Sequence, residues 1–274
     1  MNATTPIDTI ICGDCLEEMG KLPDKSIDMI LCDLPYGTTA CKWDHVIPFE
    51  PLWKEYKRLI KDRGAIVLTA SQPFTSALVM SNPGMFKYSW VWDKIRGVGH
   101  LNAKKRPMMS TEDVCVFYSN PCTYNPQMRS RDMPRKSRNH ATQEVYGTSR
   151  ETFEGDTLEN RYPINLITFS KSAQDDFTLH PTQKPVALFE YLIKTYTNEG
   201  DLVLDNCIGS GTTAIACINT NRHFIGIEKE QKYVDIANKR IKEMPVLLEK
   251  EQKYVDIANK RIKETPIPLE KFIG

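Results

Sequence analysis

Residues 27–38 read Ile-Asp-Met-Ile-Leu-Cys-Asp-Leu-Pro-Tyr-Gly-Thr, an apolar run that ends in a polar turn. Such a run, closed by an acid and a proline, is typical of a buried parallel strand and the loop after its carboxyl end. Asp33 supplies acceptors there, Pro35 fixes the turn, and Tyr36 offers an aromatic face. Because open α/β sheets bind ligands outside the carboxyl ends of their strands, this turn predicts a pocket for a flat ring with an amino group.

The rest of the chain alternates predicted strands and helices around this turn. Short apolar runs predict strands at 9–12, 27–32, 65–69, 88–92, 114–118, 201–205 and 223–228. Helical periodicity predicts helices at 16–22, 49–61, 73–81, 186–196 and 214–219. The alternation predicts an α/β fold with a doubly wound, mostly parallel sheet, in which 9–12, 16–22 and 27–32 form a βαβ unit.

A glycine-bearing loop follows the predicted strand 201–205. Gly209 and Gly211 allow the backbone to approach a ligand, and the helix after them presents free amide hydrogens to a carboxylate or phosphate. Glu228 ends the next predicted strand and is placed to accept hydrogen bonds from two ribose hydroxyls. With Asp205 before the loop, the layout predicts a nucleoside cofactor, and the absence of a Gly-Lys-Ser/Thr sequence or a third glycine argues against ATP and NAD. A purely structural tight turn is the alternative.

The middle of the chain, 95–160, has a different composition. From Met85 to Arg150 there are twelve Lys and Arg against five Asp and Glu, although the net charge of the whole chain is only +1. A polar segment of this length inside a compact domain indicates an inserted recognition region, and its charge favours contact with nucleic acid. An ordinary solvated surface is the alternative. The candidate DNA-binding residues are Lys104, Lys105, Arg106, Arg129, Arg131, Arg135, Lys136 and Arg138.

A tandem duplication occupies the end of the chain. The sixteen residues from Glu228 to Glu243 recur identically at Glu249–Glu264, and a single pair of copies is too few for a solenoid. Each copy places apolar residues on one helical stripe. We expect the first copy to dock on the domain and the second to form an extra peripheral helix.

Composition and cysteine spacing indicate which broad class of protein this sequence encodes. The 274 residues suffice for one large α/β domain with an insertion, and no apolar run approaches the roughly 20 residues that span a bilayer. Residues 1–8 lack the pattern of a secretory leader, so we expect a cytoplasmic protein. The eight cysteines are interpreted as reduced thiols, several of them in the core. Cys12-Gly-Asp-Cys15 has no second pair at zinc spacing, which predicts that no metal is bound.

Four segments together resemble the motifs of a known family. These are Asp33-Leu34-Pro35-Tyr36, His180-Pro-Thr-Gln-Lys-Pro185, the loop Asp205–Thr213 and the strand that ends in Glu228. They resemble the motifs of S-adenosylmethionine-dependent DNA amino-methyltransferases of the N-4/N-6 family, in the order of the β class. The resemblance spans the chain except about 95–160 and the second repeat copy. It implies a Rossmann-like methyltransferase sheet with an inserted target-recognition region.

The resemblance also implies a mechanism. Asp33 and the Pro35 carbonyl would accept the two hydrogens of the exocyclic amine of adenine, and Tyr36 would stack on the base after it is flipped out of duplex DNA. Family members with Asp at the first motif position mostly methylate adenine, whereas those with Ser mostly methylate cytosine. Leu34 departs from the usual Asp-Pro-Pro-Tyr and removes one proline constraint from the turn.

Cofactor roles carry over residue by residue. In the resemblance, Asp14 binds the adenine amine of S-adenosylmethionine, Glu228 the ribose, and Thr212 the methionine carboxylate. Asp205 and the backbone of Asp33–Pro35 lie near the methionine ammonium. The remaining cofactor-binding candidates are Lys184, which would assist at the carboxylate, and the loop glycines Gly209 and Gly211. Asp14 has a structural alternative, since it is also placed to cap the helix that follows it.

These observations predict a chain divided into a catalytic half (1–94), the inserted region (95–160), a cofactor-binding half (161–243) and a C-terminal extension (244–274). The expected function is adenine-specific methylation of double-stranded DNA in a prokaryotic cell or a phage-infected host. A cytosine amino-methyltransferase and a catalytically silent DNA-binding protein are the alternatives. The resemblance alone is compatible with a homodimer.

Overall fold

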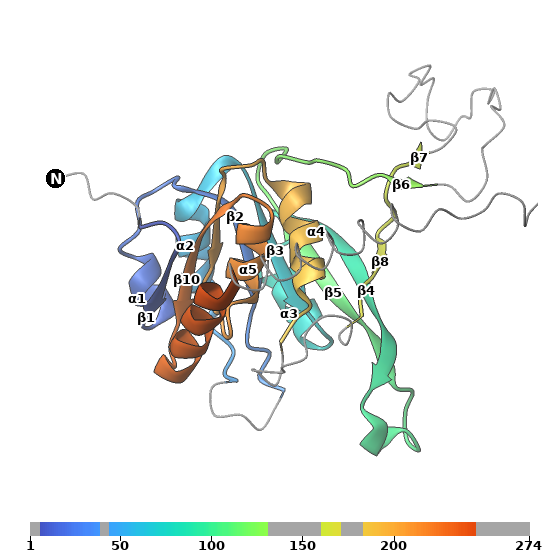
Figure 1. The fold of residues 1–274 in the computed structure, drawn as a ribbon. Helices are drawn as coiled ribbons and strands as arrows, with labels where there is room; N and C mark the ends of the chain where they lie inside the picture. Colours follow the sequence, from blue (N-terminus) through green and yellow to red (C-terminus); the bar gives the residue numbers. More distant parts are fainter. Residues whose placement is uncertain (1–5, 39–43, 131–159, 171–182, 245–274) are drawn as a thin grey trace, which may run out of the picture.

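The computed structural model describes residues 6–38, 44–130, 160–170 and 183–244, and its centre is one eight-stranded sheet (Figure 1). The strand order is β1-β10-β9-β2-β3-β5-β4-β8. Neighbouring strands are parallel except where β5 pairs with β3 and β4, so the predicted mostly parallel sheet is confirmed. The strands are β1 (Thr9–Cys12), β2 (Ile27–Asp33), β3 (Ile60–Ala70), β4 (Phe86–Val98), β5 (Met109–Phe117), β8 (Leu166–Thr168), β9 (Leu202–Asp205) and β10 (His223–Glu228).

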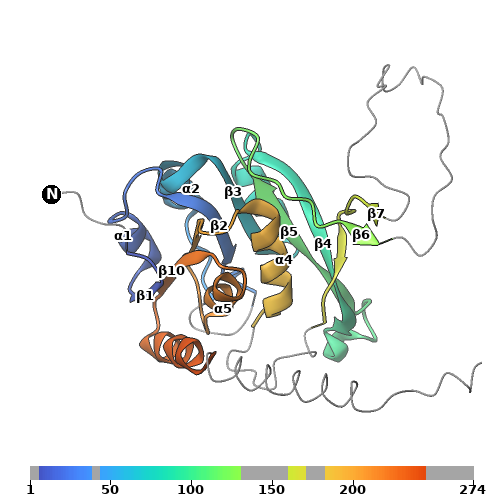
Figure 2. The same cartoon turned by 45° about the horizontal axis from the view of Figure 1, so that its top comes forward.

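Helices cover both faces of the sheet (Figures 1 and 2). Successive side chains of β2 point to opposite faces, so Ile30 and Cys32 belong to one apolar core while Met29 and Leu31 belong to the other. The first core is closed by α1 (Cys15–Met19), α2 (Phe49–Leu59) and α3 (Phe74–Ser81), and the second by α4 (Val186–Tyr196) and α5 (Thr212–Asn219). A sheet buried on both faces needs the nearly continuous apolar strands that the sequence shows.

The strand order differs from that of a simple βαβ unit at the N-terminus, in which the two strands would be neighbours. The predicted unit 9–12, 16–22, 27–32 does form two strands of one sheet, but β10 and β9 lie between β1 and β2. The register pairs Cys12 with Glu228 across β1 and β10, and Gly226 with Asp205 across β10 and β9. Two strands from the C-terminal part of the chain are therefore inserted between two from the N-terminal part, which aligns the carboxyl ends of all four.

The longest strand, β4, pairs with β5 in a hairpin that extends beyond the rest of the sheet (Figure 1). A short 3-10 turn, η1 (His100–Asn102), forms its tip. Residues 114–117 of β5 are fully buried, so the predicted inserted region 95–160 includes a core strand. A separate two-stranded ribbon, β6 (Arg129–Ser130) with β7 (Asn160–Arg161), lies outside the main sheet.

The first copy of the duplicated segment packs on the domain. Residues 231–244 are helical and follow β10 directly, with Val234 and Ala237 buried. Ile241 contacts the core that α4 and α5 share. The second copy, 249–264, lies outside the described residues.

Candidate active site

One cavity of about 580 Å³ lies at the carboxyl ends of the parallel strands. It is lined by the last residues of β2, β9 and β10 and by the segments that follow these strands and β1. Tyr36 and Gly209, which are far apart in the sequence, both face this cavity. The two motifs that the sequence singled out, the acidic turn after β2 and the glycine loop after β9, therefore share one site.

The glycine loop has the backbone geometry that glycine permits. Gly209 and Gly211 have φ angles of 52° and 86°, in the left-handed region that other L-residues rarely adopt. Gly211 is the N-cap of α5, and Thr212, the first residue of that helix, is buried and lines the cavity. A Cβ atom at Gly211 would lie 2.9 Å from Cβ of Ala237. This glycine is thus required by packing against the 231–244 helix as well as by its φ angle.

Glu228 is held at the rim of the loop by backbone amides. Gly209 N donates to Oε2 at 3.0 Å and Glu230 N donates to Oε1 at 2.9 Å. Burial raises the pKa of Glu228 above its ordinary value, and these amide hydrogen bonds oppose the shift. A carboxylate has about four lone-pair positions, so each oxygen can accept a further hydroxyl.

Asp205 is buried beneath the same loop. Its side chain accepts hydrogen bonds from Cys207 N, at 3.0 Å, and from Thr213 Oγ1. Burial raises the pKa of Asp205 to about 7, although both hydrogen bonds favour the ionised form. The carboxyl group therefore ties the start of α5 to the end of β9 and titrates near neutral pH.

The raised pKa of Asp205 predicts a pH dependence of folding. The folded chain keeps this proton up to about pH 7, whereas the ordinary pKa is 3.8, so the group stabilises the fold fully below pH 4 and loses that contribution as pH rises to 7. Asp205→Asn keeps both hydrogen-bonding positions without ionising. We expect its free energy of unfolding, relative to the wild type, to rise by on the order of 3–4 kcal/mol between pH 4 and pH 7. Urea denaturation at a series of pH values measures this, and equal pH slopes would contradict it.

Asp14 caps a helix and also lines the cavity. Its Oδ1 accepts the Leu16 amide at 3.0 Å and caps α1, as the structural alternative anticipates. The same side chain lines the cavity, and Oδ2 lies 3.7 Å from Lys229 Nζ. Its role as a cofactor ligand stays a prediction.

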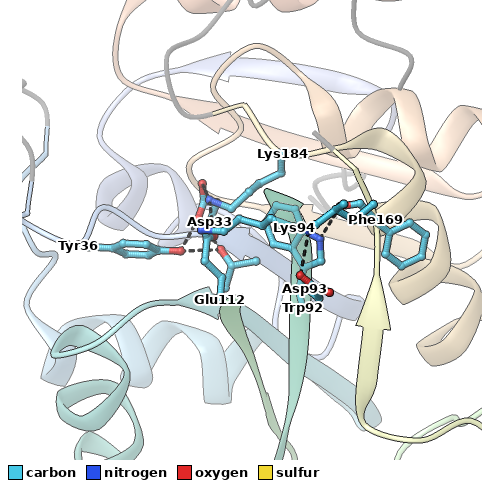
Figure 3. A network of polar contacts seen from close by, with 10 residues as sticks. Asp33, Tyr36, Trp92, Asp93, Lys94, Glu112, Phe169 and Lys184 are labelled. Atoms are coloured by element: carbon cyan, nitrogen blue, oxygen red, sulfur yellow. Dashed lines mark hydrogen bonds and ion pairs between the residues drawn. The ribbon is translucent and has the colours of Figure 1, made fainter. Parts of the chain in front are cut away.

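Asp33 lies at the centre of a polar network (Figure 3). Tyr36 Oη donates to Oδ1 at 2.8 Å, and Thr69 Oγ1 donates to the same oxygen. Lys184 Nζ donates to Oδ2 at 2.7 Å. Three donors therefore hold the carboxylate in one orientation at the cavity wall, where Pro35 and Tyr36 are its neighbours.

The network continues into the protein as a chain of charged side chains, of which the two lysines are buried. Lys184 Nζ also lies 3.4 Å from Glu112 Oε2, and Glu112 Oε1 lies 3.1 Å from Lys94 Nζ. Burial lowers the pKa of Lys184, but the charges of Asp33 and Glu112 more than offset this, so its pKa is raised and it stays cationic. Two lysines and two acids balance in charge, which is what makes their burial tolerable.

Glu112, Lys94 and Thr69 are absent from the residues that the sequence singled out. Lys184 is among them, but as an aid to the methionine carboxylate, whereas the structure pairs it with Asp33. A sequence signal for two of them exists, because Lys94 follows the predicted strand 88–92 and Glu112 precedes the predicted strand 114–118. Charged residues at the ends of buried strands are candidates for a shared site.

The aromatic ring of Tyr36 is fixed from behind. It stacks on Phe74 with 5.0 Å between ring centroids and an interplanar angle of 25°. Burial raises the pKa of the Tyr36 hydroxyl well above its ordinary value, with the charge of Asp33 as the second cause, so it remains a neutral donor. The turn beyond it is closed by buried Asp44, whose carboxylate oxygens accept Gly37 N at 2.8 Å and Thr38 N at 2.9 Å.

The candidate DNA-binding residues fall into three groups. Lys104, Lys105 and Arg106 are exposed at the tip of the β4–β5 hairpin, and Arg129 is half-buried in β6. The others, Arg131, Arg135, Lys136 and Arg138, lie outside the described residues, as does His180. Their contact with DNA stays a prediction.

The described ranges contain seven of the eight cysteines. All seven cysteines in the described ranges are free thiols, and burial raises the pKa of Cys32 to about 12. Within those same ranges, no group of three or more His, Cys, Asp and Glu side chains is arranged to hold a metal ion. None of the helices described here is long and apolar enough to span a membrane.

The duplication offers one route to a catalytically silent protein, in which residues 246–249 replace the strand that carries Glu228. The described residues do not fit this arrangement. The strand β10 itself occupies the sheet between β1 and β9, and Glu228 lines the cavity. The crevice is therefore intact despite the duplication.

Comparisons with known proteins place the chain in a family. A family described as DNA methylase, with a model for N6 and N4 methyltransferases, matches residues 27–239. Type II methyltransferase M.HpaI of Haemophilus parainfluenzae is 27% identical over 245 residues, which cover 85% of this chain and 73% of the relative. The crystal structure of the M1.HpyAVI–SAM complex has a TM-score of 0.56 and 26% identity, covering 85% of this chain and 98% of that one. The structure of PvuII DNA methyltransferase (cytosine-N4-specific) has a TM-score of 0.63, covers 86% of each chain, and at 17% identity shows likeness of fold alone.

Proposed function

Because this chain belongs to the N6/N4 DNA methylase family, we propose that it transfers a methyl group from S-adenosylmethionine to the exocyclic amine of adenine in duplex DNA. The observation that carries the proposal is the single cavity of about 580 Å³ shared by the Asp33–Tyr36 turn, the glycine loop and Glu228. A cavity of this size can hold a nucleoside cofactor beside a base.

The residues of the loop fit the cofactor chemically. Glu228 offers acceptors for the ribose hydroxyls, and Thr212 with the N-terminus of α5 offers donors for the methionine carboxylate. Asp205 supplies negative charge near the methionine ammonium. Asp14 supplies an acceptor for the adenine amine of the cofactor. S-Adenosylmethionine, when bound, supplies an electrophilic methyl group on a sulfonium.

Asp33 is suited to accept a hydrogen from the target amine. Of its roughly four lone-pair positions, three are occupied by Tyr36, Thr69 and Lys184, which leaves one for the base. Accepting that hydrogen draws the amine nitrogen toward tetrahedral geometry and offsets the positive charge that it develops. The Pro35 carbonyl would accept the second hydrogen.

Lys184 acts through Asp33. Its ammonium group is paired with both Asp33 and Glu112, and Lys94 secures Glu112 from the other side. This chain orients the Asp33 carboxylate, the group that would accept the amine hydrogen. We therefore describe Lys184 as a positioning residue.

The choice of adenine depends on the residue at the start of the turn. The resemblance of Asp33-Leu34-Pro35-Tyr36 to Asp-Pro-Pro-Tyr favours adenine over cytosine. The hydrogen-bonding argument alone does not separate the two bases, because each presents an amine with two hydrogens. The fold does not separate them either, since PvuII methyltransferase has a similar one. A homodimer and a cytoplasmic location also stay predictions.

Nucleoside analysis tests the proposal. We expect unmethylated genomic DNA, incubated with the protein and S-adenosylmethionine and then digested to nucleosides, to yield N6-methyl-2′-deoxyadenosine by mass spectrometry. A product of N4-methyl-2′-deoxycytidine would overturn the choice of base. The absence of any methylated nucleoside would favour the silent DNA-binding protein. Sequencing of the same DNA with modification detection maps the recognised site.

A further inference from the structure

The β4–β5 hairpin ends in an exposed segment, 95–109, that combines apolar and basic side chains. All of its residues except Gly97 are exposed. Leu101, at the tip, has 87% of its surface exposed, more than any other large apolar residue that the structure describes. Ile95, Val98 and Met108 are also exposed, at 59%, 46% and 44%. Exposed apolar side chains gathered in this way on a projecting element mark an interaction site.

The tip is an ordered turn. Asn102 N donates to Gly99 O at 2.9 Å, Ala103 N to His100 O at 3.1 Å, and Lys105 N to Asn102 O at 2.8 Å. Gly99 has a φ angle of 92°, which lets the strand reverse into η1. Leu101 therefore projects from a backbone fixed by hydrogen bonds, so little conformational entropy remains to be lost when it inserts into a partner.

The charge around Leu101 is uniformly positive. Arg96, Lys104, Lys105 and Arg106 are exposed, and no acid occurs between Lys94 and Thr111. Within the described ranges, none of these four forms an ion pair with another residue. Duplex DNA matches this combination. Its phosphates are complementary to the unpaired basic side chains, and its stacked bases form an apolar interior that an apolar side chain can enter.

The hairpin also starts at the catalytic cavity. Val98 lines that cavity together with Tyr36, and Lys94 ends the charged chain that leads to Asp33. Leu101 follows Val98 by three residues, a reach of roughly 10 Å at most. A base that enters the cavity from a duplex leaves a gap in the base stack outside the cavity. The β4–β5 hairpin, which projects beyond the sheet (Figures 1 and 2), contributes Val98 to the cavity wall.

We propose that residues 95–109 form a DNA-inserting finger. Leu101 enters the base stack where the target base has left it, and Lys104, Lys105 and Arg106 contact the neighbouring phosphates. The apolar side chain replaces the stacking contacts that the extruded base gives up, and thereby lowers the free-energy cost of flipping. The inference rests on the proposed function, since it concerns how the same cavity receives its substrate.

The test compares two duplexes that carry the mapped site. In one the target adenine is paired with thymine, and in the other it faces an abasic position, so that flipping costs less. We expect Leu101→Ala to slow methyl transfer at least tenfold on the paired duplex and by less than about threefold on the unpaired one. Leu101→Met, which keeps an apolar side chain of similar length, should restore transfer on the paired duplex.

Two further variants separate insertion from general binding. Met80→Ala removes an apolar side chain that is 71% exposed on α3, and it should leave both rates unchanged. Lys104→Ala combined with Lys105→Ala should weaken affinity for both duplexes alike and reduce the salt dependence of log Kd by about two.

Several results would contradict the proposal that residues 95–109 insert into DNA. Equal loss of transfer on both duplexes with Leu101→Ala would remove the inserting role while leaving the proposed function in place. A wild-type dimer that Leu101→Ala converts to a monomer, measured by sedimentation, would assign the tip to a second copy of the chain. If the wild type transferred no methyl to either duplex, the proposed function itself would fall, and the finger with it.

Discussion

Replacing Asp33 by Asn is expected to lower the rate of methyl transfer by roughly 10²- to 10⁴-fold. The amide keeps the volume of the carboxylate but loses its charge, and its NH₂ group cannot accept a hydrogen from the target amine. The glycine loop and Glu228 do not contact residue 33 through any hydrogen bond described for them, so cofactor affinity should change little. Transfer of labelled methyl to DNA and calorimetric titration with S-adenosylmethionine measure the two quantities separately.

Asp33→Ala is the harsher variant, because it leaves Lys184 with Glu112 as its remaining partner while Lys94 shares that same acid. Breaking a buried ion pair in this way costs about 3–5 kcal/mol. If Asp33→Ala lost activity while Asp33→Asn kept it, the loss would therefore reflect a lower stability of the folded protein. The matched control is Asp62→Asn, which changes an aspartate whose side chain is 81% exposed and should leave transfer unaltered. Wild-type activity in a folded Asp33→Asn protein would remove Asp33 from its proposed role.

Replacing Gly211 by Ala is expected to weaken binding of S-adenosylmethionine by roughly 10- to 100-fold, equivalent to about 1.4–2.8 kcal/mol. The new Cβ would lie 2.9 Å from Cβ and 3.3 Å from Cα of Ala237, atoms that can move only with their helix. The φ angle of 86° adds strain for any L-residue with a side chain. The loop or the 231–244 helix must shift, and either movement displaces the donors at the start of α5.

Gly200→Ala provides the matched control, because Gly200 has a similar φ angle of 81° and nothing within 4 Å of an added Cβ. That variant should show the cost of the backbone angle alone, about 1 kcal/mol of stability, with unchanged cofactor affinity. If the two variants bound cofactor equally well, packing against Ala237 would not be what sets the geometry of the loop.

Local sequence was sufficient for several elements. The helix α4 begins and ends at the predicted residues, because Pro185 precedes it and the apolar residues Leu188, Phe189, Leu192 and Ile193 recur at the helical period. The strand β10 also has its predicted bounds. The strand β3 begins five residues earlier than predicted, since the charged residues 61–63 give no apolar signal although the backbone there is already extended. Ile60 pairs with Ile27 of β2, and the register then shifts before Ala65 pairs with Met29, so residues 61–64 form an irregularity that apolar patterning does not encode.

The charged chain behind Asp33 shows why part of the site was missed. Lys184 and Asp33 are separated by 151 positions, and Lys94 and Glu112 by 18. No periodicity relates residues at such distances, and a buried lysine has the same letter as an exposed one. The pairing becomes visible only when β5 is placed beside β3 and β4.

The sequence by itself determined the alternation of helices and strands, the acidic turn, the glycine loop and the family to which they belong. These are properties of neighbouring residues, and short-range sterics and apolar periodicity encode them directly. Tertiary structure alone decided that β9 and β10 lie between β1 and β2, that Lys184 is paired with Asp33, and that Val98 of the β4–β5 hairpin lines the cavity. Strand order and charge pairing depend on contacts between distant segments, whose energies arise only when the whole core is buried.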